Sequence, residues 1–225
     1  MRKMSEVVEG GSQAGQDVFV GRVCGRGGRY VDLGAGHYRD GSNTFQLERM
    51  LAWSGIAAEI DADLRSEWSV ERPNTLMLED ALDQKVVDRI LSMGETGPID
   101  FLSLDLEPPF FTLACLVGLP LDRVKFRVVT CEHDVYRTSR SVKNAMRGIF
   151  EGYGYVRVVE DQMMAGTFEI DGRQEMTLVP VEDWWVHPDL VDLRFASDEA
   201  RKIRYQNERI HALNVEEFSK RQKGS

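Results

Sequence analysis

The chain alternates short apolar runs, typical of buried strands, with amphipathic segments of helical period. Because parallel strands are joined by long crossover connections, usually helices, this alternation constrains the fold more than any other feature of the sequence. It predicts an α/β fold built around a mainly parallel sheet. The expected strands are residues 30–33, 55–60, 75–78, 100–106, 124–130 and 155–159, and the expected helices are residues 16–23, 44–53, 83–93, 110–119 and 143–150.

Charge and cysteine content restrict the partners and the compartment. The chain has 225 residues, 3 cysteines and a formal net charge of −9, which disfavours nucleic acid and anionic membrane surfaces as partners. No stretch approaches the length of about 20 apolar residues that a membrane span needs, and the first residues do not resemble a signal peptide. With no CxxC spacing, the cysteines suit a reducing compartment. We therefore expect a cytoplasmic protein.

Composition along the chain suggests three parts. Residues 1–11 are polar and glycine-rich and are expected to be flexible, residues 12–196 form the main domain, and residues 197–225 form a charged helical tail. Within the domain, Asp171-Gly172 predicts a tight hairpin turn. The tail is interpreted either as a solvated helix docked by one thin apolar stripe or as a homodimer contact.

The most informative local motif is the run from Tyr30 to Gly36, a strand that ends in a Gly-x-Gly turn. Such a turn lets a ligand approach the backbone, although it also arises simply to fold a strand–helix unit. The third glycine of the dinucleotide fingerprint is replaced by Arg39. Carboxylates also follow the expected strands, at Asp32, Glu59, Asp80 and Asp105.

Those carboxylates bear on which cofactor the turn could bind. They would repel a pyrophosphate, whereas the sulfonium, ammonium and ribose diol of S-adenosylmethionine are all groups that a carboxylate attracts or accepts from. Glu59, at the end of the second strand, is in the position to accept both ribose hydroxyls, and Asp80 follows the third strand, where it can meet the adenine amino group. Each acid taken alone could equally be a surface loop residue.

The chain resembles the FkbM-type family of S-adenosylmethionine-dependent methyltransferases in several segments that occur in the same order. These segments are residues 12–20, 28–44 and 53–61 and the later run Asp105-Leu106-Glu107. The resemblance covers roughly residues 12–160. It implies a Rossmann-like class I methyltransferase fold, with a seven-stranded sheet and helices on both faces, and O-methylation of a hydroxyl on a small metabolite such as a sugar or polyketide. The candidate cofactor-binding residues are Gln13, Asp32, Gly34, Ala35, Gly36, Asn43, Glu59, Ile60, Asp80, Ala81 and Asp105.

The chain departs from the family pattern at two positions. Ile60 stands where the family often has proline, between Glu59 and Asp61. Pro108-Pro109 follows Glu107, where the family usually continues Gly-x-Glu. Because proline fixes φ and lacks a backbone donor, the loop after Glu107 must differ, and with it the acceptor pocket.

Methyl transfer to a hydroxyl requires alignment of the acceptor and removal of its proton. His133, which follows the fifth strand, is the predicted general base, with Asp105 and Glu132 as the other predicted catalytic residues. Asp105, Glu132 and Asp134 are also candidate ligands for Mg²⁺, since this cation prefers carboxylate oxygens.

Four aromatic residues complete the candidates: Phe110, Phe111, Trp184 and Trp185 either wall an acceptor pocket or belong to the core.

Two other readings of the chain remain open. One is an N- or carboxyl-methyltransferase with the same cofactor, and the other is a non-catalytic cofactor-binding or scaffold domain.

Overall fold

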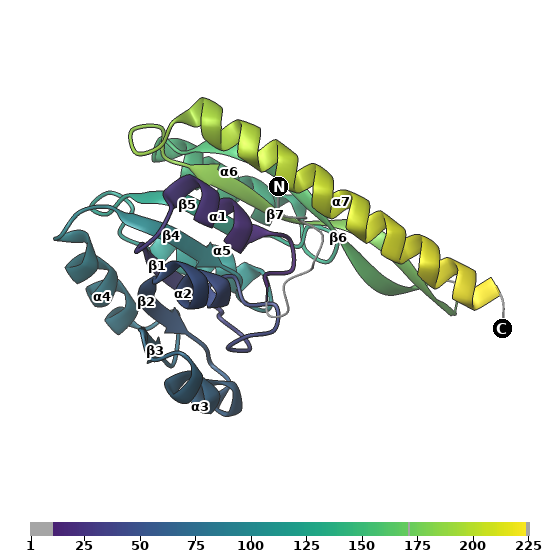
Figure 1. Ribbon diagram of the computed structural model, residues 1–225, viewed down its shortest axis with the longest axis horizontal. Helices are drawn as coiled ribbons and strands as arrows, with labels where there is room; N and C mark the ends of the chain where they lie inside the picture. Colours follow the sequence, from purple (N-terminus) through teal and green to yellow (C-terminus); the bar gives the residue numbers. More distant parts are fainter. Residues whose placement is uncertain (1–10, 171, 224–225) are drawn as a thin grey trace.

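A computed structural model describes residues 11–170 and 172–223, which form one seven-stranded sheet (Figure 1). The strand order is β3-β2-β1-β4-β5-β7-β6, and β7 runs antiparallel to both of its neighbours while the first five strands are parallel. The strands are β1 (Arg29–Leu33), β2 (Ser54–Ala58), β3 (Thr75–Leu78), β4 (Ile99–Leu104), β5 (Phe126–Glu132), β6 (Val156–Ile170) and β7 (Arg173–Val186).

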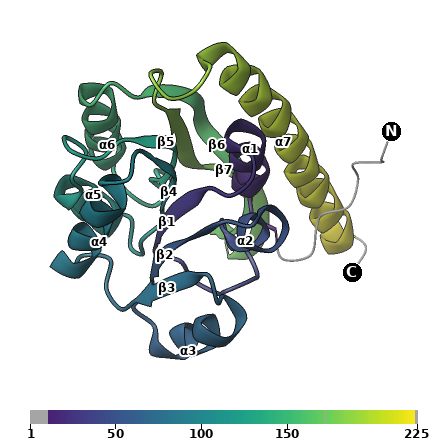
Figure 2. The same ribbon diagram turned by 60° about the vertical axis from the view of Figure 1, so that its left-hand side comes forward.

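Helices cover both faces of the sheet, with α4, α5 and α6 on one side and α1, α2 and α7 on the other (Figure 2). The helices are α1 (Gln16–Cys24), α2 (Phe45–Leu51), α3 (Ala62–Glu71), α4 (Gln84–Gly94), α5 (Phe110–Gly118), α6 (Arg140–Gly152) and α7 (Leu193–Lys223). This arrangement confirms the expected Rossmann-like α/β fold, a mainly parallel seven-stranded sheet with helices on both faces. None of the described helices is long and apolar enough to cross a membrane.

Two buried clusters explain why the central strands are apolar at nearly every position. Val31 and Leu102 pack toward α4, α5 and α6, whereas their neighbours Tyr30 and Phe101 pack toward α1, α2 and α7. Successive side chains of a strand point to opposite faces, so a sheet covered on both faces needs apolar residues without alternation. The same parity decides which strand-end residues can meet.

The β6–β7 hairpin is much longer than predicted, because β6 continues past residue 159 to Ile170. Ile170 pairs with Arg173, which confirms a hairpin at the predicted turn; Gly172 has φ +74°, and Asp171 lies outside the described residues. The distal part of the hairpin, residues 163–170 and 173–180, extends beyond the sheet beside α7, and we call it the arm (Figure 1).

Helix α7 begins at Leu193 and passes unbroken through residue 197, where the sequence analysis places the start of the tail. Ala196, Ala200 and Ile203 in its first half are buried against the sheet, and its second half accompanies the arm. The homodimer contact expected through this helix stays a prediction. Of the expected flexible segment, residues 1–10 lie outside the described residues.

Candidate functional site

The glycine turn lies at the carboxyl end of β1, next to β4, where the order of the sheet reverses. Ligands of open α/β sheets bind in the crevice at such a switch point. Gly34 and Gly36 both have positive φ, at +81° and +59°. A Cβ at Gly36 would meet nothing within 4 Å, whereas one at Gly34 would overlap the carbonyl oxygen of Asp105. Gly34 is therefore required for packing of the turn against the loop after β4, and Gly36 is the glycine that leaves space for a ligand.

Glu59, directly after β2, is held beside this turn by two backbone donors. Its Oε2 accepts from the N–H of Gly36 at 2.8 Å, and its Oε1 accepts from the N–H of Asp61 at 2.8 Å. Each carboxylate oxygen can accept a further hydrogen bond, so a vicinal diol could bind here. Ile60, the next residue, is 77 % exposed, which leaves an apolar side chain free beside the carboxylate.

Asp80 and Ala81 follow β3 at the same edge of the sheet. Asp80 is exposed, and its Oδ1 accepts from the N–H of Leu82 at 2.8 Å. Ala81 is half-buried, and its carbonyl oxygen lies 3.6 Å from the Sγ of Cys115 on α5. The backbone of this loop is thus anchored while the carboxylate of Asp80 is open to a ligand.

Asp32, at the end of β1, is 2 % exposed and turned into the protein. It accepts a hydrogen bond of 2.8 Å from the hydroxyl of Thr44, and burial raises its pKa to about 6. The neighbouring Asn43 donates from Nδ2 to the hydroxyl of Ser103 on β4, at 3.0 Å. These contacts attach the loop before α2 to the two central strands, so Asp32 positions the loop and is shielded from solvent.

Three carboxylates converge on a small cavity at the carboxyl ends of β4 and β5. Its volume is about 20 Å³, room for roughly one water molecule. Asp105 and Glu132 share a hydrogen bond, and burial raises the pKa of both carboxyls; the proximity of Asp105 raises the pKa of Glu132 further. The cavity is lined by Gln13, Ala14, Gln16, Gly41, Asn43, Asp105, Glu132, Met164, Val181 and Glu182.

Glu182 on β7 is the member of this group that sequence reasoning missed. It is 4 % exposed, accepts a hydrogen bond of 2.8 Å from the indole N–H of Trp184, and is also hydrogen-bonded to the side chain of Gln16. Burial raises its pKa to about 8. Predicting its position would have required the antiparallel register in which it faces Glu132, and the chain shows no local signal for that register.

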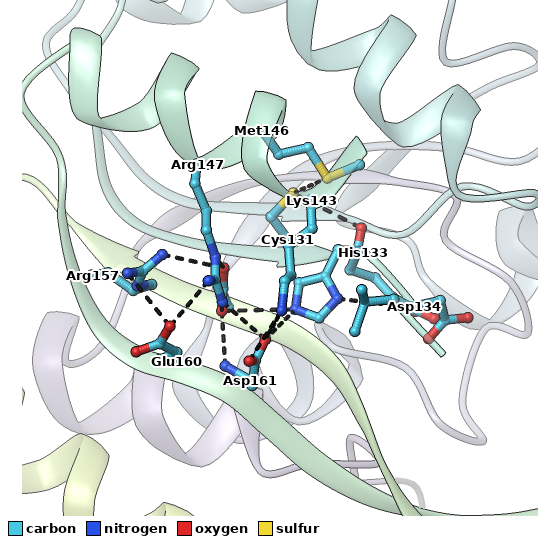
Figure 3. Close-up of polar contacts among 12 residues, drawn as sticks. Cys131, His133, Asp134, Lys143, Met146, Arg147, Arg157, Glu160 and Asp161 are labelled. Carbon is cyan, nitrogen blue, oxygen red and sulfur yellow. Dashed lines mark hydrogen bonds and ion pairs between the residues drawn. The ribbon is translucent and has the colours of Figure 1, made fainter. Parts of the chain in front are cut away.

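His133 does not join Asp105 and Glu132, and this corrects its predicted role as general base. It follows Glu132 directly, and its ring points to the opposite face of the sheet, toward α6 (Figure 3). The ring is 2 % exposed, with Nε2 3.1 Å from Oδ1 of Asp161 and 3.7 Å from Oδ1 of Asp183. The sheet therefore separates the His133 ring from the side chains of Asp105 and Glu132.

The acids around His133 form a charge network with basic residues of α6 (Figure 3). Arg147 donates to Asp183 at 2.7 Å and to Asp161 at 2.8 Å, and Lys143 lies 3.0 Å from Asp161. His133 and Arg147 hold the pKa of the buried Asp183 well below its ordinary range despite burial. Asp161 lies in an irregular part of β6 with φ +52°, so this network fixes the base of the arm to α6.

Two of the three predicted magnesium ligands, Glu132 and Asp134, lie close together beside Glu107, and magnesium binding stays a prediction. Asp134 is 1 % exposed and is bonded to the guanidinium of Arg137, which also pairs with Glu107. Glu107, Glu132 and Asp134 place one oxygen each within 4.8 Å of one another, and Asp105 is not part of that group. Arg137 pairs with Glu107 and Asp134 and lies 4.0 Å from Glu132, so a divalent cation would compete with its guanidinium for these oxygens.

The candidate aromatic residues divide into two pairs. Trp184 and Trp185 are core residues, exposed by 0 % and 1 %, and they stack on Phe19 and Phe150 respectively. Phe110 and Phe111, at the start of α5, are exposed by 53 % and 36 %. The loop before them is closed by the Thr112 hydroxyl, which bonds both the N–H and the carbonyl of Leu106. Only the phenylalanine pair is available at the surface.

Comparisons with known proteins do not assign the chain to a family. No family model matches the chain, and no curated protein matches its sequence. Solved structures that resemble it include a precorrin-6y C5,15-methyltransferase from Geobacter metallireducens GS-15 (14% identity, TM-score 0.48, covering 76% of this chain and 87% of that one). Another is a TehB-like SAM-dependent methyltransferase from Corynebacterium glutamicum (12% identity, TM-score 0.41, covering 77% and 87%). Similarities at this level carry no inference, and the fold assignment rests on the strand order of the chain itself.

Proposed function

We propose that the protein is an S-adenosylmethionine-dependent methyltransferase that methylates a hydroxyl group of a small metabolite. The observation that carries the proposal is the pairing of Glu59 with the backbone N–H of Gly36, at the point where the sheet order reverses. It sets an acidic acceptor for a ribose diol beside a turn whose second glycine faces open space. The exposed Ile60 and Asp80 extend the same edge of the sheet and suit the adenine ring and its amino group.

The charges at this edge favour a cationic cofactor over a dinucleotide. Glu59 and Asp80 present acidic side chains beside the turn, and a pyrophosphate placed near them would be repelled. The sulfonium and ammonium groups of S-adenosylmethionine would instead favour the ionised forms of Asp105, Glu132 and Glu182, whose pKa values are raised by burial. When bound, S-adenosylmethionine supplies an electrophilic methyl carbon attached to its sulfonium.

The chain's own part in the reaction is to align the acceptor and to take its proton. Glu132 is the best-placed base, because its side chain is 20% exposed and adjoins Asp105, whereas Glu182 is nearly enclosed. With the cofactor and an alcohol bound, the carboxylate of Glu132 would accept the proton of the acceptor hydroxyl. Asp105, hydrogen-bonded to Glu132, orients this carboxylate.

Ligand selectivity tests the proposal at the level of the cofactor. Isothermal titration calorimetry should detect binding of S-adenosylhomocysteine to the wild-type protein, and no binding of NAD⁺ at the same concentration. Transfer of a labelled methyl group to members of an alcohol panel, followed by mass spectrometry of the products, then tests O-methylation. Absence of S-adenosylhomocysteine binding, or preference for NAD⁺, would contradict the proposal.

A further inference from the structure

A second, larger cavity lies between the arm and the second half of α7 (Figure 1 shows the two elements side by side). Its volume is about 520 Å³, which falls in the range of about 300–1,000 Å³ typical of small-molecule sites. We call it the arm groove. It is lined by Gln13, Met164, Ala165, Met176, His211 and Asn214.

The arm groove adjoins the carboxylate cavity, because Gln13 and Met164 line both. The segment that separates them is clamped in place. The side-chain amide of Asn207 on α7 donates to the carbonyl of Ala14, and Ser12 forms a bridge with Gly41 of the loop before α2. A ligand in the arm groove therefore has its inner end at the wall of the cavity that contains Asp105 and Glu132.

The lining of the arm groove is apolar or neutral. Two methionines and an alanine supply apolar surface, and thioethers adapt to irregular ligand shapes. Gln13 and Asn214 are amides, and burial lowers the pKa of His211, so its imidazole is uncharged at neutral pH. Within the part of the chain that the structure describes, none of the six lining side chains carries a charge at pH 7 that could pair with an ionic ligand.

We propose that the arm groove is the acceptor site, and that it selects an uncharged, elongated molecule that carries a hydroxyl at its inner end. The proposal rests on the methyltransferase function proposed above. An ionic group would lose its hydration in this groove without gaining a partner, whereas an alkyl or neutral glycosidic body would contact Met164, Ala165 and Met176. Gln13 and Asn214 offer hydrogen bonds to hydroxyls along that body.

Ala165 is the position at which the groove can be filled with least disturbance of the core. It pairs with Leu178 in the arm, two positions along β7 from Met176 and on the same face. Ala165→Trp adds a large side chain to the groove lining. Thr177→Trp is the matched control, because Thr177 is exposed and lies between Met176 and Leu178, with its side chain on the opposite face of the same strand.

The test uses octyl glucoside, a neutral probe with an alkyl body and hydroxyls, below its micellar concentration, with octylamine and octanoate as charged analogues. We expect calorimetry to show that octyl glucoside binds the wild type at least tenfold more tightly than either analogue. Ala165→Trp should weaken its binding at least tenfold, and Thr177→Trp by less than twofold. Met176→Ala, which removes apolar surface without adding bulk, should also weaken it.

Binding of S-adenosylhomocysteine, measured for every variant, keeps the two proposals apart. Its absence from the wild type contradicts the methyltransferase function, whereas equal probe affinity in Ala165→Trp and Thr177→Trp overturns the acceptor groove alone. Preference for a charged analogue, or no probe binding, also overturns it. Concentration-dependent dimerisation that Ala165→Trp abolishes, in a protein that does not bind the probe, would instead assign the groove to a second copy of the chain.

Discussion

Glu132 on β5 and Glu182 on β7 are directly opposite each other in the sheet, and both side chains line the same small cavity. Burial raises the pKa of both carboxyls, and the nearby like charge of Asp105 raises each of them further. The folded protein therefore carries raised carboxyl pKa values at the edge where methyl transfer is proposed. This relationship makes both stability and catalysis dependent on pH.

The stability of the protein should fall as the pH rises between about 4.5 and 8. Glu182 has its pKa raised from 4.5 to about 8 by burial, so the folded state binds a proton that the unfolded state has already lost in this window. The stabilisation that comes from the raised pKa of Glu182 is fully present below pH 4.5 and is lost as the pH rises through 8. Glu182→Gln should remove this loss and increase the free energy of unfolding at pH 8.5 by about 1–3 kcal/mol relative to wild type. Urea denaturation at pH 5.5 and 8.5 measures the effect, and parallel pH dependence of the two proteins would contradict it.

Catalysis should depend on Glu132. Removal of a positioned base costs about 10²–10⁴-fold in rate, so Glu132→Gln should reduce kcat by that factor with little change in S-adenosylhomocysteine affinity. Since the pKa of Glu132 is raised, wild-type activity should increase with pH above the ordinary carboxyl range, and the variant should lack this rise. Glu151→Gln, an exposed acid near the end of α6, is the control. A loss of less than fivefold, with the pH profile intact, would exclude Glu132 as the base.

The charge network of His133, Asp183 and Arg147 should stabilise the folded protein. The pKa of Asp183 is held below its ordinary range in the folded protein. Its contribution to stability is therefore present above pH 3.8 and is lost as the pH falls through the lowered pKa. Arg147→Met removes one of the two side chains, with His133, that lower the pKa of the buried Asp183, and it should cost about 3 kcal/mol at pH 7, and less at pH 3. Arg140→Met, at the exposed start of α6, should change stability by less than about 0.5 kcal/mol. Equal losses at both pH values would contradict the role assigned to Asp183.

The two glycines of the turn should respond differently to alanine. Gly34→Ala places a Cβ against the Asp105 carbonyl and should prevent folding or shift the melting temperature strongly. Gly36→Ala meets no atom, so its cost should be limited to about 1–2 kcal/mol for the positive φ. Thermal unfolding followed by circular dichroism distinguishes the two. Similar melting temperatures for both variants would show that the packing of Gly34 is not the constraint.

The sequence predicted the elements whose signal is local and left open those set by long-range packing. The apolar run ending at Leu33 and the glycines after it indicated β1 and the turn directly, because both depend on neighbouring residues. Helix α3 was missed because its apolar residues form no clear stripe at helical spacing. The helix begins after Asp61, whose side chain accepts from the backbone N–H groups of Asp63 and Leu64. The length of β6 was missed because a two-stranded arm against a helix has no continuous apolar pattern.

The candidate site followed the same division. Glu59 was expected from its position after a strand, and the structure places it against the turn. His133 was expected beside Asp105 because both residues follow neighbouring strands, but the structure turns its ring to the face of the sheet that α6 covers. Glu182 could not be found, since it reaches the cavity only through the antiparallel pairing of β7 with β5.

The central claim is that Glu59 and the glycine turn bind the nucleoside part of S-adenosylmethionine, and calorimetric titration of Glu59→Ala with S-adenosylhomocysteine tests it most directly. Loss of a charged acceptor for a hydroxyl pair should weaken binding by about 1–3 kcal/mol, or roughly five- to 150-fold. Glu71→Ala, an exposed acid at the far end of α3, should bind as the wild type does. A folded Glu59→Ala protein with wild-type affinity would contradict the claim.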